Sequence, residues 1–285
     1  MPPDGAATHR PPASPSFLLI GSTKSGTTSL HDWLSRHPDV FMHPWKEMRF
    51  FCEAERWSRG VGWYRGEFAR RGEAAAWGEA SNGYTRRGEH PGVPERVAAL
   101  CPDVRLVYVV RDPMRRLVSH YRHRLATGIE WRRPEDAVRA DPAYVETGLY
   151  GWQLAAWRAV FPAERILVLQ SEALFADPPP AIERLAAHLG VAPRPELAFR
   201  AENAAADRRA VPAGLRRLSA LGPLRGAVKR ASRHLPGPLR ARAPLSAAPV
   251  TLPPDLRADL ARRFAEDRRL LEDFAGSEVT REWAD

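Results

Sequence analysis

The chain has 285 residues, with 43 Lys or Arg against 34 Asp or Glu, so its formal net charge is +9. A hydrophobic content of 44% with 27% charged residues excludes a wholly disordered or fibrous chain and permits one large core. Two cysteines, Cys52 and Cys101, give no disulfide framework and no metal-ligand spacing, which favours a reducing, cytoplasmic setting. No long apolar run occurs, so we expect neither a membrane span nor a secretion signal.

The positive charge is not concentrated as nucleic-acid binding requires. Arginines alternate with acidic residues, as in 70–73, and basic residues stand almost alone only between 208 and 242. We therefore expect no nucleic-acid partner. A basic nucleic-acid-binding protein stays an alternative, recognisable by an affinity that falls steeply with salt. Only Lys24, Lys46 and Lys229 among the 43 basic residues are lysines, which singles out each of them.

Strands and helices are predicted to alternate along the chain. Residues 1–15, rich in proline and without periodicity, are expected to form a disordered leader. A continuous apolar run at 17–20 indicates a strand buried on both faces, and largely apolar segments at 104–110 and 165–169 indicate further buried strands, with a weaker candidate at 75–80. Helical spacing of apolar residues predicts helices at 28–36, 113–126, 147–160, 181–189 and 252–274. This order predicts an α/β fold, a P-loop-like doubly wound parallel sheet flanked by helices, in one domain over 16–285.

The loop after the first predicted strand, residues 21–29, has the composition of a phosphate-binding site. Its small residues let the backbone approach an anion, and the free N–H groups of a helix N-terminus favour negative charge. Gly21 and Gly26 are separated as in the Walker A pattern, but Thr27 stands where that pattern has lysine. The lysine is instead Lys24, a compact cation that fits inside a tight loop. The alternative is a loop that only turns the chain.

A second motif follows the predicted strand at 104–110. Arg111 ends this strand, and Ser119 lies two turns into the next helix. A guanidinium and a hydroxyl so placed could converge on one phosphate. For Arg111 the alternative is an ordinary ion pair at the end of a strand.

These two motifs resemble those of sulfotransferases that use 3′-phosphoadenosine 5′-phosphosulfate (PAPS). The loop with its displaced lysine is similar to the family's 5′-phosphosulfate loop. Residues 111–121 match its R-D-P-x-x-R-x-x-S-x-Y pattern, in which the Arg and the Ser bind the 3′-phosphate. Residues 37–40, 46–51 and 60–64 resemble the branch that sulfates heparan sulfate and related carbohydrates. The resemblance covers residues 16–190 and, more loosely, 250–285.

The resemblance implies a PAPS-dependent sulfotransferase acting on a hydroxyl of a carbohydrate, glycosylated metabolite or other small molecule. It implies that Glu47 is the general base and that Lys24 stabilises the leaving phosphate. The residues expected to bind the nucleotide are Lys24, Ser25, Gly26, Thr27, Thr28, Ser29, Arg111 and Ser119. The residues expected to bind the acceptor are Lys46, Arg49, Glu79, Ser81 and Tyr84. Sulfuryl transfer requires no metal in principle, and the sequence has no convincing cluster of metal ligands, so none is predicted.

Several alternatives stay open. A nucleotide kinase-like P-loop enzyme would require Mg²⁺, and a scaffold with an inactive sulfotransferase fold would share the motifs. His120 or His123 is an alternative base, although their place beside Tyr121 favours packing. Lys46 either tunes the site or faces solvent. Residues 208–250 are expected to form a basic, proline-rich loop or lid, or else a solvated segment. The oligomeric state and the role of Lys229 are not predicted.

Overall fold

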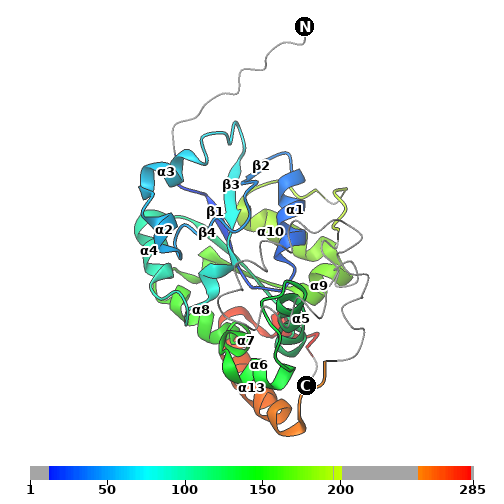
Figure 1. Ribbon diagram of the computed structural model, residues 1–285. Helices are drawn as coiled ribbons and strands as arrows, with labels where there is room; N and C mark the ends of the chain where they lie inside the picture. The colour runs from blue at the N-terminus through cyan, green and yellow to red at the C-terminus, as the bar shows by residue number, and fades with distance from the viewer. Residues whose placement is uncertain (1–12, 195, 201–249, 284–285) are drawn as a thin grey trace, which may run out of the picture. The chain divides into compact units, whose positions relative to one another are not determined.

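The computed structural model describes residues 13–194, 196–200 and 250–283 (Figure 1). Lys229 and nearly all of the expected lid at 208–250 lie outside these residues. The chain divides into two compact units. The first comprises residues 1–112, 149–202 and 266–285, and the second comprises 113–148 and 203–265. The single domain expected over 16–285 stays a prediction.

The first unit is built on a five-stranded sheet in which every pair of neighbouring strands is parallel. Its order is β2-β3-β1-β4-β5. The strands are β1 (Phe17–Gly21), β2 (Val40–Met42), β3 (Ala76–Ala80), β4 (Arg105–Val110) and β5 (Ile166–Gln170). The predicted α/β fold with a doubly wound parallel sheet is thus confirmed, whereas the short β2 was not predicted.

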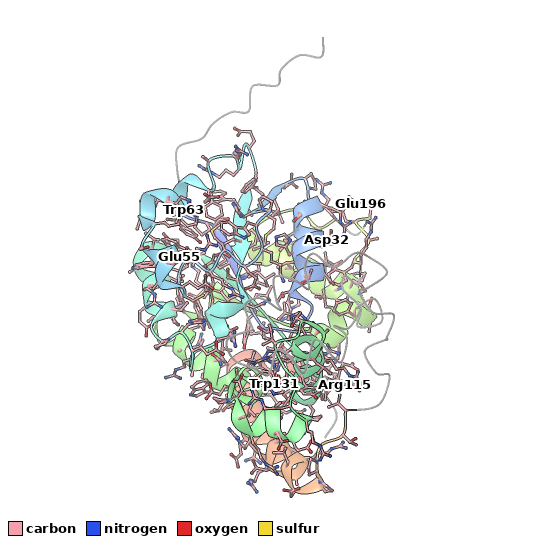
Figure 2. All side chains as sticks on the ribbon, viewed as in Figure 1. Asp32, Glu55, Trp63, Arg115, Trp131 and Glu196 are labelled. Carbon is pink, nitrogen blue, oxygen red and sulfur yellow. The ribbon has the colours of Figure 1, made fainter. Side chains whose placement is uncertain are left out.

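Helices cover both faces of this sheet (Figure 1). One face carries α1 (Thr27–Arg36), α9 (Ser171–Ala176) and α10 (Pro178–Leu189). The other carries α3 (Gly60–Gly66), α4 (Val93–Leu100) and α8 (Tyr150–Arg158), with α2 (Ala54–Trp57) beside α3. Asp32 on α1 and Trp63 on α3 mark the two sides in Figure 2. Three 3-10 helices are η1 (Asn82–Thr85), η2 (Ala163–Arg165) and η5 (Ser277–Thr280).

The continuous apolar run of β1 follows from this two-sided burial. Phe17 and Leu19 pack with the α1 side, and Leu18 and Ile20 pack with the α3 side. Successive side chains of a strand point to opposite faces, so a strand covered on both faces is apolar throughout. All four side chains are fully buried.

The second unit contains α5 (Pro113–Ala126), α6 (Pro134–Ala140), α7 (Ala143–Glu146) and the first half of α13 (Pro254–Ala275). The fully buried carboxylate of Glu130 accepts hydrogen bonds from the Tyr144 hydroxyl and the Trp131 main chain, both at 3.0 Å. Arg116, also fully buried, donates to the Tyr144 carbonyl oxygen. The second arginine of the R-D-P-x-x-R pattern therefore holds this unit together.

The chain is held in place before the expected end of the leader at residue 15. The Ser14 carbonyl accepts a hydrogen bond of 2.8 Å from Trp77 Nε1, and the Ser14 hydroxyl donates to Leu100 O at 3.3 Å. Within the described ranges, none of the helices combines the length and the hydropathy that crossing a bilayer requires.

Asp267 fixes the start of α8, which begins at Tyr150 rather than at the expected residue 147. Its carboxylate accepts hydrogen bonds from Gly151 N at 2.9 Å and Trp152 N at 2.7 Å. Burial raises the pKa of this carboxyl to about 6, while the main-chain hydrogen bonds oppose the shift. The side chain thus satisfies N–H groups that the first turn of a helix leaves open.

Asp267→Ala is expected to lower the free energy of unfolding by about 2 kcal/mol, because it removes a cap and leaves two partly buried N–H groups unsatisfied. Urea denaturation at neutral pH measures the change. Asp273→Ala, at an exposed position of the same helix, is the control and should stay within about 0.5 kcal/mol. Equal midpoints for the two variants would contradict the capping role.

Candidate active site

The loop predicted to bind phosphate connects β1 to α1. Gly26 is the N-cap of α1 with φ of 90°, and no side chain caps the helix. A Cβ at this position would lie 2.6 Å from Phe175 Cε2, and the left-handed backbone conformation requires glycine. The Ser22 and Ser25 hydroxyls, both fully buried, lie 2.5 Å apart inside the loop. The loop therefore presents an uncapped helix N-terminus, which favours an anion.

The predicted nucleotide-binding residues of this loop differ in exposure. Ser25, Thr27 and Ser29 are buried, while Lys24, Gly26 and Thr28 are half-buried. The hydroxyl of Ser25 is engaged by Ser22, so its side chain stabilises the loop. The half-buried residues Lys24, Gly26 and Thr28 are exposed enough to contact a ligand.

Arg111 lies against this loop, at the end of β4. Its Nη1 donates a hydrogen bond of 3.2 Å to the Lys24 carbonyl oxygen. Its Nε is 3.9 Å from Glu172 Oε1, an atom that also accepts from Asp112 N at 3.1 Å. Burial raises the pKa of Glu172. Ser119 is half-buried on α5, in the second unit, and its convergence with Arg111 stays a prediction.

Glu47 lies at the carboxyl end of β3, where it is held by several donors. Its main-chain N–H donates to Ala80 O at 2.7 Å. Its carboxylate accepts from Asn82 Nδ2 at 2.6 Å, from Asn82 N at 3.2 Å and from Arg49 Nε at 3.3 Å. The side chain keeps 26% of its surface exposed. The sequence offered no signal for Asn82, because an asparagine that starts a 3-10 helix looks like an ordinary turn residue.

The Lys46 ammonium contacts the phosphate loop, and the acceptor contact expected of this residue stays a prediction. Its Nζ donates to Thr28 Oγ1 at 2.9 Å and to Thr27 Oγ1 at 3.3 Å. Burial lowers the pKa of this ammonium, an effect that the neighbouring Glu47 opposes. Adjacent residues 46 and 47 thus direct their charges to different parts of the site.

Three residues of the candidate site have an unusual backbone conformation. Lys24, Glu47 and Arg49 have φ of 74°, 65° and 56°, and they are the non-glycine residues with positive φ in the described part of the chain. The left-handed region costs an L-residue on the order of 1 kcal/mol. Such conformations persist where surrounding contacts fix them, and they are common in active sites.

A buried network supports the segment that carries Glu47 and Arg49. The Arg49 main-chain N–H donates to Ser81 Oγ at 2.8 Å, and Ser81 Oγ donates to Glu79 Oε2 at 2.8 Å. Glu79 Oε1 accepts from the Tyr84 hydroxyl at 2.5 Å. Burial raises the pKa of Glu79 to about 7, although its hydrogen bonds oppose the shift. Glu79 and Ser81 have no exposed surface. In this structure they support the segment that carries Glu47 and Arg49, whereas the sequence led us to expect that they contact the acceptor.

Tyr84 and Arg49, also expected to bind the acceptor, lie in different surroundings. Tyr84 is almost fully buried but borders a groove of about 350 Å³ lined by residues of α4 and α8. Arg49 lies between two carboxylates, with Nη1 2.9 Å from Glu53 Oε1.

Trp45 and Trp57 on the neighbouring segments are each 39% exposed. Burial raises the pKa of the nearby Cys52 to about 12.

The candidate site lacks an evident metal centre in the part of the chain that the structure covers. No three His, Cys, Asp or Glu side chains gather there as a ligand set.

Comparison with known families identifies the same family that the sequence motifs resemble. Residues 14–203 match the family model described as a sulfotransferase domain. The chain belongs to the sulfotransferase family. Human heparan sulfate glucosamine 3-O-sulfotransferase 6 is 30% identical over an alignment of 185 residues that covers 62% of this sulfotransferase and 52% of the relative. Bovine bifunctional heparan sulfate N-deacetylase/N-sulfotransferase 2 is 28% identical over 198 residues, 63% of this chain and 22% of the relative.

The chain spans about half of the first of these relatives and about a fifth of the second. Among solved structures, a sulfotransferase from Alicyclobacillus acidocaldarius has a TM-score of 0.62 at 25% identity, covering 92% of this chain and 95% of that one. A mouse sulfotransferase complexed with PAP has a TM-score of 0.50 at 14% identity, covering 91% and 89%. At this identity, the match to the mouse protein shows only that the two proteins share a fold.

Glu79→Gln is expected to change how stability depends on pH. The folded protein holds the Glu79 proton up to about pH 7, whereas the ordinary pKa is 4.5, so the contribution of this group to stability falls as pH rises through that window. Relative to the glutamine variant, the wild type should lose about 3 kcal/mol between pH 4.5 and 8.

Urea denaturation of both proteins at the two pH values measures this loss. Glu55→Gln, at an exposed acid of α2 (Figure 2), is the matched control and should run parallel to the wild type. A Glu79→Gln protein that also runs parallel would show that the carboxyl titrates normally in the folded state.

Proposed function

We propose that this chain transfers a sulfuryl group from PAPS to a hydroxyl of a carbohydrate, glycosylated metabolite or other small molecule. One observation carries the proposal: the phosphate loop and Arg111 follow β1 and β4, and Glu47 is hydrogen-bonded to the end of β3, three strands that are neighbours in the sheet. In parallel α/β sheets, ligands bind at the carboxyl ends of such strands. A donor with two phosphates and an acceptor would therefore meet at one edge. Membership of the sulfotransferase family supports the type of reaction.

The residues at this edge fit an anionic nucleotide. The uncapped N-terminus of α1, the Thr28 hydroxyl and Lys24 would hold the 5′-phosphosulfate. Arg111 would hold the 3′-phosphate together with Ser119. Its Nη2 donates no hydrogen bond to any described residue, and one third of the side chain is exposed. The mouse relative of this fold was solved with PAP, adenosine 3′,5′-bisphosphate, which supports a donor of this class.

The residues of the site would divide the chemistry between proton transfer and charge stabilisation. Glu47 takes the proton of the acceptor hydroxyl as that oxygen forms its bond to sulfur. Lys24 stabilises the negative charge on the bridging oxygen of the 5′-phosphate as the bond from this oxygen to sulfur breaks. The sulfated acceptor and PAP leave, and Glu47 returns its proton to water. Asn82 and Arg49 hold the Glu47 carboxylate in one orientation throughout.

The surface beside Glu47 supports a sugar-like or aromatic acceptor. Exposed tryptophans present flat apolar faces, and Trp45 and Trp57 lie close in sequence to Glu47. Arg56 stacks over the Trp45 ring at 4.2 Å, which fixes the orientation of this face. The heparan sulfate relatives act on carbohydrate, which favours that class.

PAP is expected to bind the full chain and to stabilise it by about 2.7 kcal/mol at a concentration one hundred times its Kd. Calorimetry and thermal unfolding measure both quantities. Mg²⁺-ATP, the ligand of a P-loop kinase, should bind much more weakly than PAP. Arg111→Met should reduce the preference for PAP over AMP at least tenfold, because only PAP carries the 3′-phosphate. Tight Mg²⁺-ATP binding without PAP binding would overturn the proposal.

Glu47→Gln is expected to keep the affinity for PAP within twofold and to slow sulfuryl transfer at least about a hundredfold, because the amide cannot take a proton. Release of PAP from PAPS is followed with a panel of sugar and phenol acceptors. Glu55→Gln is the control and should match the wild type. Full activity of the Glu47 variant would assign the base to another residue, such as a histidine.

A further inference from the structure

Lys46 is a cation at the edge of the phosphate loop that is bound by hydroxyl groups and not by a carboxylate. Its Nζ contacts two hydroxyl groups, those of Thr27 and Thr28, and forms no ion pair with any described carboxylate. Arg49, three residues later, pairs with both Glu47 and Glu53. The same short segment thus holds one cation in direct ion pairs and one, Lys46, on which the Glu47 carboxylate acts without a direct ion pair.

The surroundings of Lys46 favour an anion beside it. The side chain is half-buried, and burial lowers the pKa of its ammonium. A partly desolvated charge gains more from an opposite charge than an exposed one does, because fewer water dipoles screen the pair. Hydroxyls orient the ammonium but bring no negative charge. An anionic group that enters between the loop and this segment would supply it.

The position of Lys46 identifies which anionic group that is. Its ammonium lies on hydroxyls at the N-terminus of α1, the end that would hold the 5′-phosphosulfate. The next residue along the chain is Glu47, whose carboxylate is held on the other side by Asn82. A group between the leaving phosphate and the base is the one that is transferred.

We propose that Lys46 is a further catalytic residue, whose ammonium contacts the oxygens of the transferring sulfuryl group. The inference rests on the proposed function. Thr27 and Thr28 hold the ammonium in place, so it need not be reoriented during the reaction. Lys24 acts on the oxygen from which the sulfuryl group departs, and Lys46 acts on the group itself.

Two other roles for Lys46 make different predictions. A tether that only joins residues 43–49 to the loop would affect all nucleotides equally. A contact to the acceptor would affect neither PAPS nor PAP in the absence of acceptor. Only a contact to the sulfuryl group separates PAPS, which carries this group, from PAP, which lacks it.

The experiment compares the Kd values of PAPS and PAP for the full chain without acceptor. Lys46→Met should weaken PAPS about tenfold, or about 1.4 kcal/mol, and leave PAP within twofold. Lys46→Arg should recover part of the loss because it keeps the charge. Arg70→Met, at an exposed arginine for which the structure gives no side-chain partner among the described residues, removes the same charge and should change neither Kd.

The outcomes separate this inference from the proposed function. Equal weakening of both nucleotides by Lys46→Met would assign Lys46 to the tether, and unchanged Kd values for both nucleotides would assign it elsewhere. Either result overturns the inference while wild-type binding of PAPS and PAP upholds the proposed function. A wild-type protein that binds neither nucleotide overturns both.

A second measurement uses only the wild-type chain, so its result does not depend on whether the Lys46 variant folds. The sequence has three lysines, which an amine-reactive reagent and mass spectrometry can follow one by one. PAPS should protect Lys46 from the reagent more than PAP does, whereas both nucleotides should protect Lys24. Equal protection of Lys46 by the two nucleotides would overturn the inference.

Discussion

Two hydrogen bonds anchor the segment of Glu47 and Arg49 to the end of β3, and the candidate site is organised around them. Glu47 N donates to Ala80 O at 2.7 Å, and Arg49 N donates to Ser81 Oγ at 2.8 Å. Met48 between them is fully buried. The segment therefore cannot shift without exposing an apolar side chain and breaking main-chain contacts, which offsets the cost of positive φ at residues 47 and 49. Because β3 neighbours β1, the same anchor holds the expected base near the phosphate loop.

The sheet and its loop could be predicted because their signals are local and strong. The runs that became β1, β4 and β5 are apolar along most of their length, as expected of strands covered on both faces. Gly26 marks the start of α1 because a left-handed N-cap in contact with Phe175 tolerates no side chain. In contrast, β2 has three residues, too few for a period to appear. It pairs with β3 only as part of the assembled sheet, a long-range contact that its own three residues do not indicate.

The orientation of individual side chains could not be read from the sequence. Lys46 and Glu47 are neighbours, yet the first contacts α1 and the second contacts η1, because the backbone at Glu47 is left-handed. No residue type announces that conformation here, since glycine is absent from both positions. Glu79 illustrates the same point: a glutamate at a strand end was expected to face a ligand, and full burial among Tyr84 and Ser81 makes it a support.

The division of charge within this segment explains why position 46 carries a lysine in a chain whose other bases are nearly all arginine. An arginine there would present a planar fork suited to a carboxylate, and Glu47 and Glu53 are each already paired with one nitrogen of Arg49. A compact ammonium can instead donate to two hydroxyls and leave the carboxylate to its own donors. The site thus keeps one positive charge that is in no direct ion pair with a described carboxylate, on the side where an anion would enter.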